Sequence, residues 1–360
     1  MDLIEQSLQQ HLRQHPATLE GLWAVDENLP ALSEIAPQAG LSLLTNRVDL
    51  QTRGEALGWT IRCSDFDFSP WADASLDRVY YRISKEKAVV HHIINQAWRV
   101  LKPGGELLLL GARQEGTKTY YDKARKLFGQ GELDKLGKGD FAGILTRGTQ
   151  ATDDPSLRLD DRDYSQLRPI ADDFISKPGL FGWDKLDQGS AFLADHLAEL
   201  WPRLSTPQPR VLDLGCGYGY LAARAHEQGA ASVVATDNNA AALLACQANF
   251  DRLGISGQVL ADNCGASLDE RFDLLLCNPP FHQGFALEGE LTERFVSTAA
   301  RLTAFDGVAL FVVNQFIPLE RKAQGLFAEI DTFADNGSFK LVRLARPKGD
   351  KPIRSRARRR

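Results

Sequence analysis

The sequence lacks the signatures of several protein classes. Its five cysteines, spread over 360 residues, include no C-x-x-C pair, which argues against a zinc knuckle or a redox dithiol. No apolar run approaches the roughly 18 residues that a membrane helix requires. The first residues have neither a basic segment nor an apolar core, the two parts of a secretory signal. We therefore expect a cytoplasmic protein with no metal site and no membrane association.

The sequence also lacks a GxxxxGKS or GxxxxGKT loop, which argues against a P-loop nucleotide hydrolase. Its net charge is only −5. Residues 346–360 hold eight Lys or Arg and one acid, whereas the rest of the chain has 34 basic and 46 acidic side chains. A uniformly basic nucleic-acid binder is therefore excluded. We expect residues 346–360 to be a disordered basic tail, which either contacts phosphate or only aids solubility.

The length predicts about two domains at roughly 150 residues each. Residues 1–145 have a mixed α/β pattern, and residues 146–178 are polar, contain several prolines and are predicted to connect the domains. Residues 179–345 form the second predicted domain. In the first domain we expect a strand at 79–81, a helix over 85–101 stopped by 102–105, a strand at 106–110 and a helical piece at about 120–128.

From Ser190 onward the pattern becomes regular, because predicted strands and helices alternate. The predicted helices cover 191–200, 220–228, 240–253 and 291–302, and the predicted strands cover 211–214, 233–236, 258–261, 272–277, 308–313 and 339–345. Such alternation is typical of a parallel sheet that helices cover on both faces.

Two segments about 200 residues apart echo each other. Residues 99–111 (RVLKPGGELLLLG) and 301–313 (RLTAFDGVALFVV) both have the pattern of a helix end, a tight turn and a buried strand. The echo favours two copies of one fold. Independent use of the same helix-turn-strand pattern is the alternative.

A glycine-rich turn follows the predicted strand at 211–214. Gly215, Gly217 and Gly219 stand directly before a predicted helix. Glycines at this place let the backbone turn tightly and let a ligand approach the main chain. The turn alone is compatible with a dinucleotide, with a sulfonium nucleoside or with a purely structural role.

Acids end the next two predicted strands. Asp237 closes the second strand, 22 residues after Gly215, where an acid can bind the ribose hydroxyls of a nucleoside or cap the following helix. Asp262 and Asn263 close the third strand at the same sheet edge. There an acid can accept from the exocyclic amine of adenine, a surface turn being the alternative.

The most specific motif is Asn278-Pro279-Pro280-Phe281, which follows a buried strand. Two prolines fix the backbone and remove two N–H donors. The Asn278 side-chain oxygen and the Pro279 carbonyl remain as acceptors, and together they can bind both protons of a planar amine. The ring of Phe281 offers a face on which a base can stack. A nicotinamide enzyme has no need of this arrangement.

These motifs together resemble the class I S-adenosylmethionine-dependent methyltransferases, and within that class the bacterial ribosomal RNA guanine-N2 methyltransferases. The matching segments are DLGCGYG (213–219), Asp237, Asp262, NPPFHQG (278–284) and the upstream run 179–190. The resemblance is strong over about 177–345, and residues 79–111 resemble the family's N-terminal half. Residues 337–340 resemble the C-terminal strand of the small-subunit enzymes, which favours that branch.

The resemblance implies an α/β protein with two tandem Rossmann-like methyltransferase domains, each built on a seven-stranded, mostly parallel sheet. The N-terminal copy has no glycine-rich loop and no Asn-Pro-Pro triplet, so we expect it to be degenerate and without activity. S-adenosylmethionine is the implied cofactor. The residues implied to bind it are Asp213, Gly215, Gly217, Gly219, Asp237, Asp262, Asn263 and Asn278, and those implied to act on the substrate amine are Asn278, Pro279 and Phe281.

The implied substrate is ribosomal RNA of the small subunit or its assembly intermediate, with the protein acting as a monomer. The N-terminal domain would then grip RNA or support the catalytic domain. Lys118, Lys123, Arg125 and Lys126, interleaved with Tyr120 and Tyr121, are candidates for RNA contact. At helical spacing this pattern more often marks a solvated face.

Other functions remain open at this stage. An Asn-Pro-Pro-aromatic motif can also bind other planar amines. These are the N2 amine of a guanine in large-subunit RNA, the N6 amine of adenine and the side-chain amide of a release-factor glutamine. A ribosome assembly factor without catalysis is the alternative from another class. His282 is expected to pack within the loop, Cys216 to fill space between glycines, and Cys277 to be buried and inert.

Overall fold

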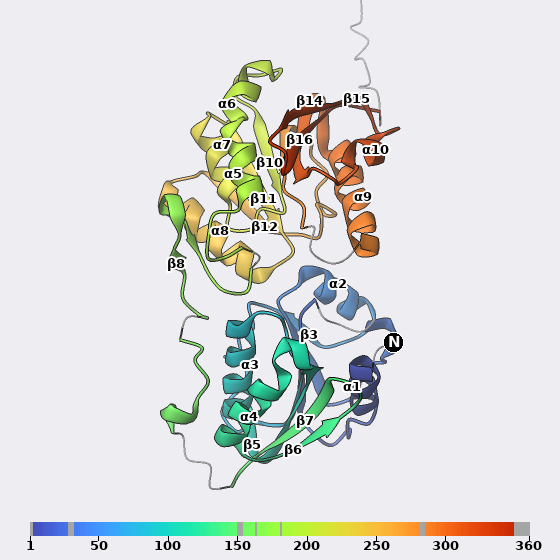
Figure 1. Cartoon of the computed structure of the whole chain (residues 1–360), viewed down its shortest axis with the longest axis vertical. Helices are drawn as coiled ribbons and strands as arrows, with labels where there is room; N and C mark the ends of the chain where they lie inside the picture. Colours follow the sequence, from blue (N-terminus) through green and yellow to red (C-terminus); the bar gives the residue numbers. More distant parts are fainter. Residues whose placement is uncertain are drawn as a thin grey trace, which may run out of the picture. The chain divides into compact units, whose positions relative to one another are not determined.

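The computed structural model describes residues 3–27, 32–149, 154–162, 164–180, 182–280 and 285–348. The chain divides into two compact units (Figure 1). The first comprises Met1–Leu167 with Lys177–Leu180 and Asn239–Ala241. The second comprises Arg168–Ser176, Phe181–Asn238 and Ala242–Arg360.

The first unit begins with a helix and then builds a sheet. Its helices are α1 (Leu3–Arg13), α2 (Val48–Ala56), α3 (Lys87–Val100) and α4 (Thr117–Phe128). Its strands are β1 (Gly21–Val25), β2 (Leu41–Thr45), β3 (Ile61–Cys63), β4 (Leu76–Arg82), β5 (Leu101–Ala112), β6 (Gly129–Lys135) and β7 (Asp140–Arg147). Short 3-10 helices lie at Leu32–Glu34, Arg113–Glu115 and Pro155–Leu157.

The second unit repeats this plan after a small hairpin of β8 (Arg168–Pro169) and β9 (Ile175–Ser176). Its helices are α5 (Gln188–Asp195), α6 (Leu197–Leu200), α7 (Tyr220–Glu227), α8 (Ala240–Leu253), α9 (Phe285–Leu302) and α10 (Leu319–Ala323), with 3-10 turns at Ala171–Asp173 and Trp201–Arg203. Its strands are β10 (Arg210–Leu214), β11 (Ser232–Asp237), β12 (Gly257–Ala261), β13 (Phe272–Cys277), β14 (Thr303–Asn314), β15 (Phe327–Asp335) and β16 (Phe339–Pro347).

The two sheets have the same topology. The strand order is β3-β2-β1-β4-β5-β7-β6 in the first and β12-β11-β10-β13-β14-β16-β15 in the second. In each sheet the first five strands are parallel and the last two pairings are antiparallel, so only the sixth strand, β7 or β16, runs opposite to the others. The predicted fold class, two tandem α/β domains of mostly parallel seven-stranded sheets, is confirmed.

Helices cover both faces of the first sheet (Figure 1). Side chains of a strand alternate between its two faces, and β1 shows this directly. Leu22 and Ala24 join the core under α3 and α4, whereas Trp23 and Val25 join the core under α1. A sheet buried on both faces explains why β1 is a continuous apolar run, as parallel strands of this type are.

One core of the second unit lies between its sheet and helices α9 and α10. Strand β13 supplies the fully buried Phe272, Leu275 and Cys277, and α9 covers them with Phe295 and Val296. This packing fixes the carboxyl end of β13, where the Asn-Pro-Pro motif begins.

The two echoing segments occupy equivalent places. Where β4 pairs with β5, the register moves from Leu76↔Leu101 to Arg78↔Glu106, and where β13 pairs with β14 it moves from Phe272↔Thr303 to Leu274↔Val308. Each sheet therefore carries the same bulge of three extra residues. Residues 102–105 were expected to separate a helix from a strand, but β5 begins directly after α3 and contains them.

Side-chain bonds repeat between the units as well. Glu20 N–H donates to Asp77 Oδ2 over 2.9 Å, and Arg210 N–H donates to Asp273 Oδ2 over 2.8 Å. Arg99 on α3 donates to backbone carbonyls of the loop before β4, and Arg301 on α9 donates to backbone carbonyls of the loop before β13. Because fold, bulge and bonds coincide, the units are two versions of one fold.

Some boundaries differ from those expected. β7 continues to Arg147, and β16 continues to Pro347, where Arg346 Nε pairs with Glu329 Oε1 over 2.7 Å. Residues 349–360, most of the expected tail, lie outside the described residues. Among the helices that the structure describes, none is both long and apolar enough to cross a membrane.

Candidate functional site

The glycine-rich turn lies between β10 and α7. Gly215, Gly217 and Gly219 all have positive φ, at 82°, 54° and 85°. A Cβ on Gly219 would lie 2.7 Å from Cys246 Sγ, so close packing requires glycine there. A Cβ on Gly217 would meet no heavy atom within 4 Å. The backbone at Gly217 is thus open to a ligand.

Asp237, at the end of β11, lies against this turn. Its Oδ2 accepts a hydrogen bond from Gly217 N–H over 2.9 Å. The N–H groups of Gly215 and Cys216 donate to Thr236 O, both over 2.9 Å. These bonds hold the acid beside the glycines, as its proposed role in binding a ribose requires.

Asp213, the acid of β10, is buried beneath the turn. It is 1% exposed, and its Oδ2 accepts from Ala222 N–H over 2.9 Å. Within the described part of the chain its Oδ1 has no hydrogen-bond partner. Burial, and to a smaller extent the charge of Asp237, raise the pKa of Asp213 to about 7. A buried acid with an unpaired oxygen is positioned to favour a cation nearby.

Asp262 has a clear local role. It is 3% exposed, and its Oδ1 and Oδ2 accept from the N–H groups of Ala266 and Ser267, both over 2.8 Å. The carboxylate therefore holds the turn after β12, where the half-buried Asn263 follows it. A contact of Asp262 or Asn263 with adenine stays a prediction.

Asn278 is held by two residues from the start of α5. Its Nδ2 donates to Asp187 Oδ2 over 2.7 Å and to Ser190 Oγ over 2.9 Å. Both amide hydrogens are thereby used, and Oδ1 is the side-chain atom left to accept from a substrate. Pro279, whose carbonyl is the second predicted acceptor, follows directly in the chain and is buried.

Of the other residues singled out in the sequence, two cysteines are buried and two residues of the Asn-Pro-Pro loop lie outside the described residues. Cys216 and Cys277 are buried, and their pKa values are raised, that of Cys216 mainly by a hydrogen bond with Cys246 and that of Cys277 by burial. Neither is therefore a reactive thiolate. Phe281 and His282 lie outside the described residues.

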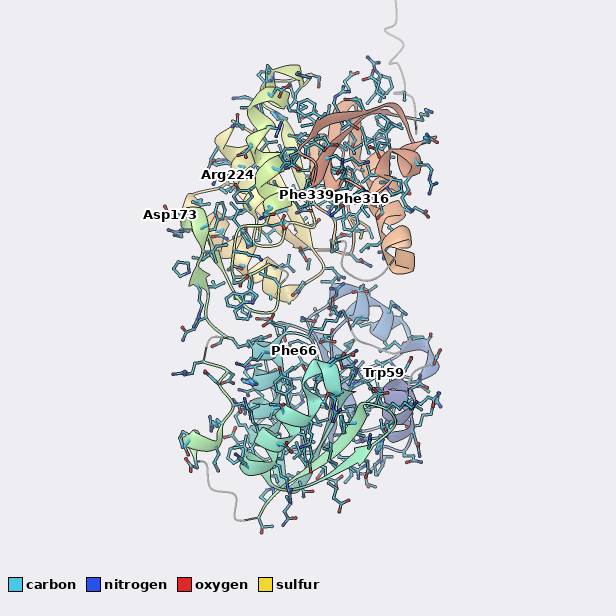
Figure 2. All side chains as sticks on the ribbon, in the orientation of Figure 1. Trp59, Phe66, Asp173, Arg224, Phe316 and Phe339 are labelled. Carbon is cyan, nitrogen blue, oxygen red and sulfur yellow. The ribbon has the colours of Figure 1, made fainter. Side chains whose placement is uncertain are left out.

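Four further residues at this sheet edge received no role from the sequence. Asp187 and Ser190 bind Asn278, and Phe339 lies near them, because a Cβ on Gly189 would be 3.4 Å from both Phe339 Cε1 and Asn278 Nδ2. Phe316 follows β14 (Figure 2). It is 88% exposed. In the sequence, Asp187 and Ser190 were indicated only by their place in the run 179–190, which resembles a segment of the methyltransferase family.

The same edge of the first unit lacks these groups. Aligning the units on their shared bonds and strand registers places different side chains at the positions of Asp213, Asp237, Asp262 and Asn278. They are Trp23, Thr45, Ser64 and Arg82. The first unit therefore keeps the fold without the acids or the asparagine.

Side chains from the connecting segment cover part of that edge in the first unit. Tyr164 OH donates to Asp65 Oδ1 over 2.7 Å, and the buried Lys177 ammonium pairs with the same carboxylate. The ammonium also lies 4.1 Å from the Tyr164 ring centroid. Burial lowers the pKa of Lys177. Tyr164 and Lys177 thus both bind the carboxylate of Asp65, which is consistent with a structural role for the three side chains.

The predicted RNA contact on α4 is only partly exposed. Lys123, Arg125 and Lys126 are exposed, but Tyr121 belongs to the core, and Tyr120 packs edge-on against His91 at 5.6 Å. Tyr121 is thus unavailable as a stacking face and Tyr120 is half-buried, whereas the helix has the solvated basic face that its spacing favoured.

The arrangement in the second unit fits a positively charged nucleoside. Gly217 leaves room beside the main chain, Asp237 supplies hydroxyl acceptors, and the unpaired Oδ1 of Asp213 favours a cation. No group of three or more His, Cys, Asp or Glu within the described ranges is arranged to hold a metal ion.

Comparison with known proteins assigns the class. The model of the methyltransferase small domain family matches residues 172–343. The matched range covers most of the second unit, which is therefore similar to the methyltransferase domains of this family.

The chain as a whole is similar to particular members of that class. It is 28% identical to the ribosomal RNA small subunit methyltransferase C of Shewanella loihica, over 74% of this chain and 76% of the relative. The corresponding protein of Shewanella amazonensis is 26% identical, over 84% and 86%. The structure of T. thermophilus 16S rRNA N2 methyltransferase RsmC, in complex with AdoMet and guanosine, matches with a TM-score of 0.79 and 24% identity, covering 96% of this chain and 92% of that one.

Proposed function

We propose that this protein transfers a methyl group from S-adenosylmethionine to the exocyclic N2 amine of a guanine in small-subunit ribosomal RNA. The observation that carries the proposal is the orientation of Asn278. Its amide nitrogen is bound by Asp187 and Ser190, so that its oxygen is an acceptor beside Pro279. The names of the relatives, and the guanosine bound by one of them, support the same substrate.

The cofactor would lie on the glycine-rich turn. Gly217 leaves room beside the main chain in the turn that Gly215 and Gly219 help to form, Asp237 binds the ribose hydroxyls, and the carboxylate of Asp213 favours the cofactor's positive charge. When bound there, S-adenosylmethionine supplies a methyl group on a sulfonium sulfur, and its transfer leaves a neutral thioether. Asp262 and Asn263 would border the adenine.

The chemistry required of the protein is chiefly orientation. The lone pair of guanine N2 is delocalised into the ring, so the amine is a weak nucleophile. Acceptance of its two N–H bonds by Asn278 Oδ1 and the Pro279 carbonyl favours a pyramidal nitrogen whose lone pair is available. Correct placement contributes several kcal/mol in favourable cases. The surplus proton passes to solvent, and we assign no general base.

The guanine must be unstacked to reach this site. Phe316 offers an aromatic face for an unpaired base, because its ring is 88% exposed at the edge where Asn314 pairs with Phe339. The turn is well fixed: Ile317 N–H donates to Asn314 O over 2.9 Å, and Leu319 is fully buried. The first unit, which lacks the site residues, would support the second or contact RNA through its exposed basic side chains.

We further propose that the protein acts as a monomer in the cytoplasm, on naked small-subunit RNA or on an assembly intermediate. The test is incubation with methyl-tritiated S-adenosylmethionine and, separately, small subunits, large subunits and bare ribosomal RNA from cells that lack this protein. Nucleoside mass spectrometry then identifies the product. N2-methylguanosine in small-subunit RNA is expected. Label in large-subunit RNA, in adenine, in a protein glutamine or nowhere would contradict the proposal.

A further inference from the structure

We infer that Asp187 is a positioning residue that fixes and polarises the amide of Asn278 for methyl transfer. This inference rests on the proposed function, since it assigns Asn278 Oδ1 as an acceptor for the target amine. It assigns a role to a carboxylate outside the Asn-Pro-Pro motif and outside the glycine-rich turn.

The geometry leaves one orientation for the amide. Asp187 Oδ2 lies 2.7 Å from Asn278 Nδ2, and an ionised carboxylate can only accept hydrogen bonds. A rotated amide would place Oδ1 against Oδ2, which is repulsive at this distance. Ser190 Oγ, 2.9 Å from the same nitrogen, accepts its second hydrogen. Ser190 alone could not enforce this orientation, because a hydroxyl can donate as well as accept.

Asp187 is itself fixed by the helix that follows. It is the N-cap of α5, and the Oδ2 that binds Asn278 also accepts Ser190 N–H over 2.8 Å. Gly189 lies between them, and a Cβ there would be 3.1 Å from Asp187 Oδ2 and 3.4 Å from Asn278 Nδ2. The absence of a side chain at this position allows the close approach of the loop to β13.

The charge of Asp187 has a chemical consequence at the other end of the amide. A carboxylate that accepts from an amide N–H increases the electron density on the amide oxygen, because hydrogen bonds in a chain polarise one another. The amine nitrogen becomes positively charged as it is methylated, so its N–H groups become stronger donors. The bond to Oδ1 is then strongest in the transition state, and its loss lowers kcat more than it changes KM.

The experiment uses the full chain and removes the contact while keeping the helix cap. Serine caps helices about as well as aspartate, but it is too short to reach Asn278, so Asp187→Ser is the main variant. Asp187→Asn keeps the acceptor and removes the charge. Asp154→Ser is the matched control, because Asp154 also caps a helical turn, through Ser156 N–H, and is remote in sequence from the site.

Steady-state methylation of small-subunit RNA, which gives kcat and KM, is measured together with the Kd for S-adenosylmethionine and the Tm. A hydrogen bond to a charged group contributes about 1.5–3 kcal/mol, so Asp187→Ser is expected to lower kcat roughly 10- to 100-fold, with KM and cofactor Kd nearly unchanged. Asp187→Asn should fall between Asp187→Ser and the parent. Asp154→Ser should match the parent.

A double variant separates positioning from a general structural role. If Asp187 acts through Asn278, adding Asp187→Ser to Asn278→Ala lowers kcat no further. Multiplicative losses, or an unchanged kcat in Asp187→Ser, would overturn the inference.

A readout without RNA separates this inference from the proposed function. The side-chain amide signal of Asn278, assigned in ¹⁵N spectra by its loss in Asn278→Ala, should shift in Asp187→Ser and not in Asp154→Ser. An unshifted signal overturns the positioning role. A shifted signal in a protein that methylates no RNA overturns the proposed function and leaves the positioning of Asn278 supported.

Discussion

The main-chain N–H of Gly217 donates to the carboxylate of Asp237 over 2.9 Å, across 20 residues of sequence. This bond joins the turn after β10 to the end of β11, so that the open backbone at Gly217 and the acid face the same space. One ligand can therefore contact the Gly217 backbone and the Asp237 carboxylate together. This limits the proposed cofactor position to the space beside these two groups, which the glycine pattern alone does not do.

Replacing Asp237 therefore should weaken cofactor binding directly. We expect Asp237→Ala to raise the Kd for S-adenosylmethionine by at least about tenfold, because a charged hydrogen-bond acceptor contributes roughly 1.5–3 kcal/mol. Isothermal titration calorimetry measures the change. Asp306→Ala is the control, since Asp306 is an exposed acid within the bulge of β14. Equal affinities of Asp237→Ala and the parent would remove Asp237 from the site.

Asn278→Ala should separate binding from chemistry. The variant loses the side-chain acceptor but none of the groups proposed to hold the ribose or the positive charge. Methylation should fall at least about 100-fold, in the range found when a transition-state hydrogen-bonding group is removed, while the cofactor Kd changes little. Tritium transfer to RNA and calorimetry measure the two effects. Normal turnover in this variant would show that the acceptor-pair mechanism is wrong.

The sequence predicted the strands of the second unit well because the signals are local. The apolar run at 272–277 and the glycines after 214 each identify an element without reference to the rest of the chain. α9 begins at Phe285, six residues before its predicted start at 291, and β5 absorbs the turn at 102–105. For β5, pairing with β4 and β7 extends the strand beyond its local pattern.

The contacts that complete the site could not be predicted from local patterns. Asp187 and Asn278 are 91 residues apart and meet only because α5 lies near the end of β13. Phe316 is an aromatic residue of the kind usually found in a core, yet it is 88% exposed while Leu319, three residues later, is fully buried. Conversely, Tyr120 and Tyr121 were candidates for RNA contact, but Tyr121 is buried in the core and Tyr120 packs against His91 of α3.

Phe316 provides a test of RNA contact that is independent of catalysis. Stacking of a base on an aromatic ring contributes about 1–3 kcal/mol, so Phe316→Ala should weaken binding to the substrate RNA roughly 5- to 100-fold. Its Tm should stay unchanged because the ring is exposed, and Phe316→Trp should retain affinity. Phe305→Ala is the matched control, since Phe305 is a 37% exposed phenylalanine in the bulge of β14. Equal RNA affinities for the two alanine variants would contradict the contact.

Asp213 links stability to pH. Burial raises its pKa to about 7, above the roughly 3.9 of an unfolded aspartate. The folded protein therefore holds this proton more tightly than the unfolded chain. The resulting stabilisation is present below about pH 4 and is lost as the pH rises to about 7. Asp213→Asn carries no such proton, yet its amide oxygen can still accept from Ala222 N–H.

The free energy of unfolding should consequently respond to pH differently in the two proteins. From pH 4 to pH 8, the free energy of unfolding of Asp213→Asn should rise relative to that of the parent by on the order of 4 kcal/mol. Urea unfolding at each pH measures both values. Asp306→Asn, an exposed control, should track the parent. Saturating S-adenosylmethionine should reduce the shift, because a nearby positive charge favours the carboxylate and lowers its pKa. A shift equal with and without cofactor would separate Asp213 from the cofactor site, and no shift at all would mean that folding does not raise the pKa of Asp213.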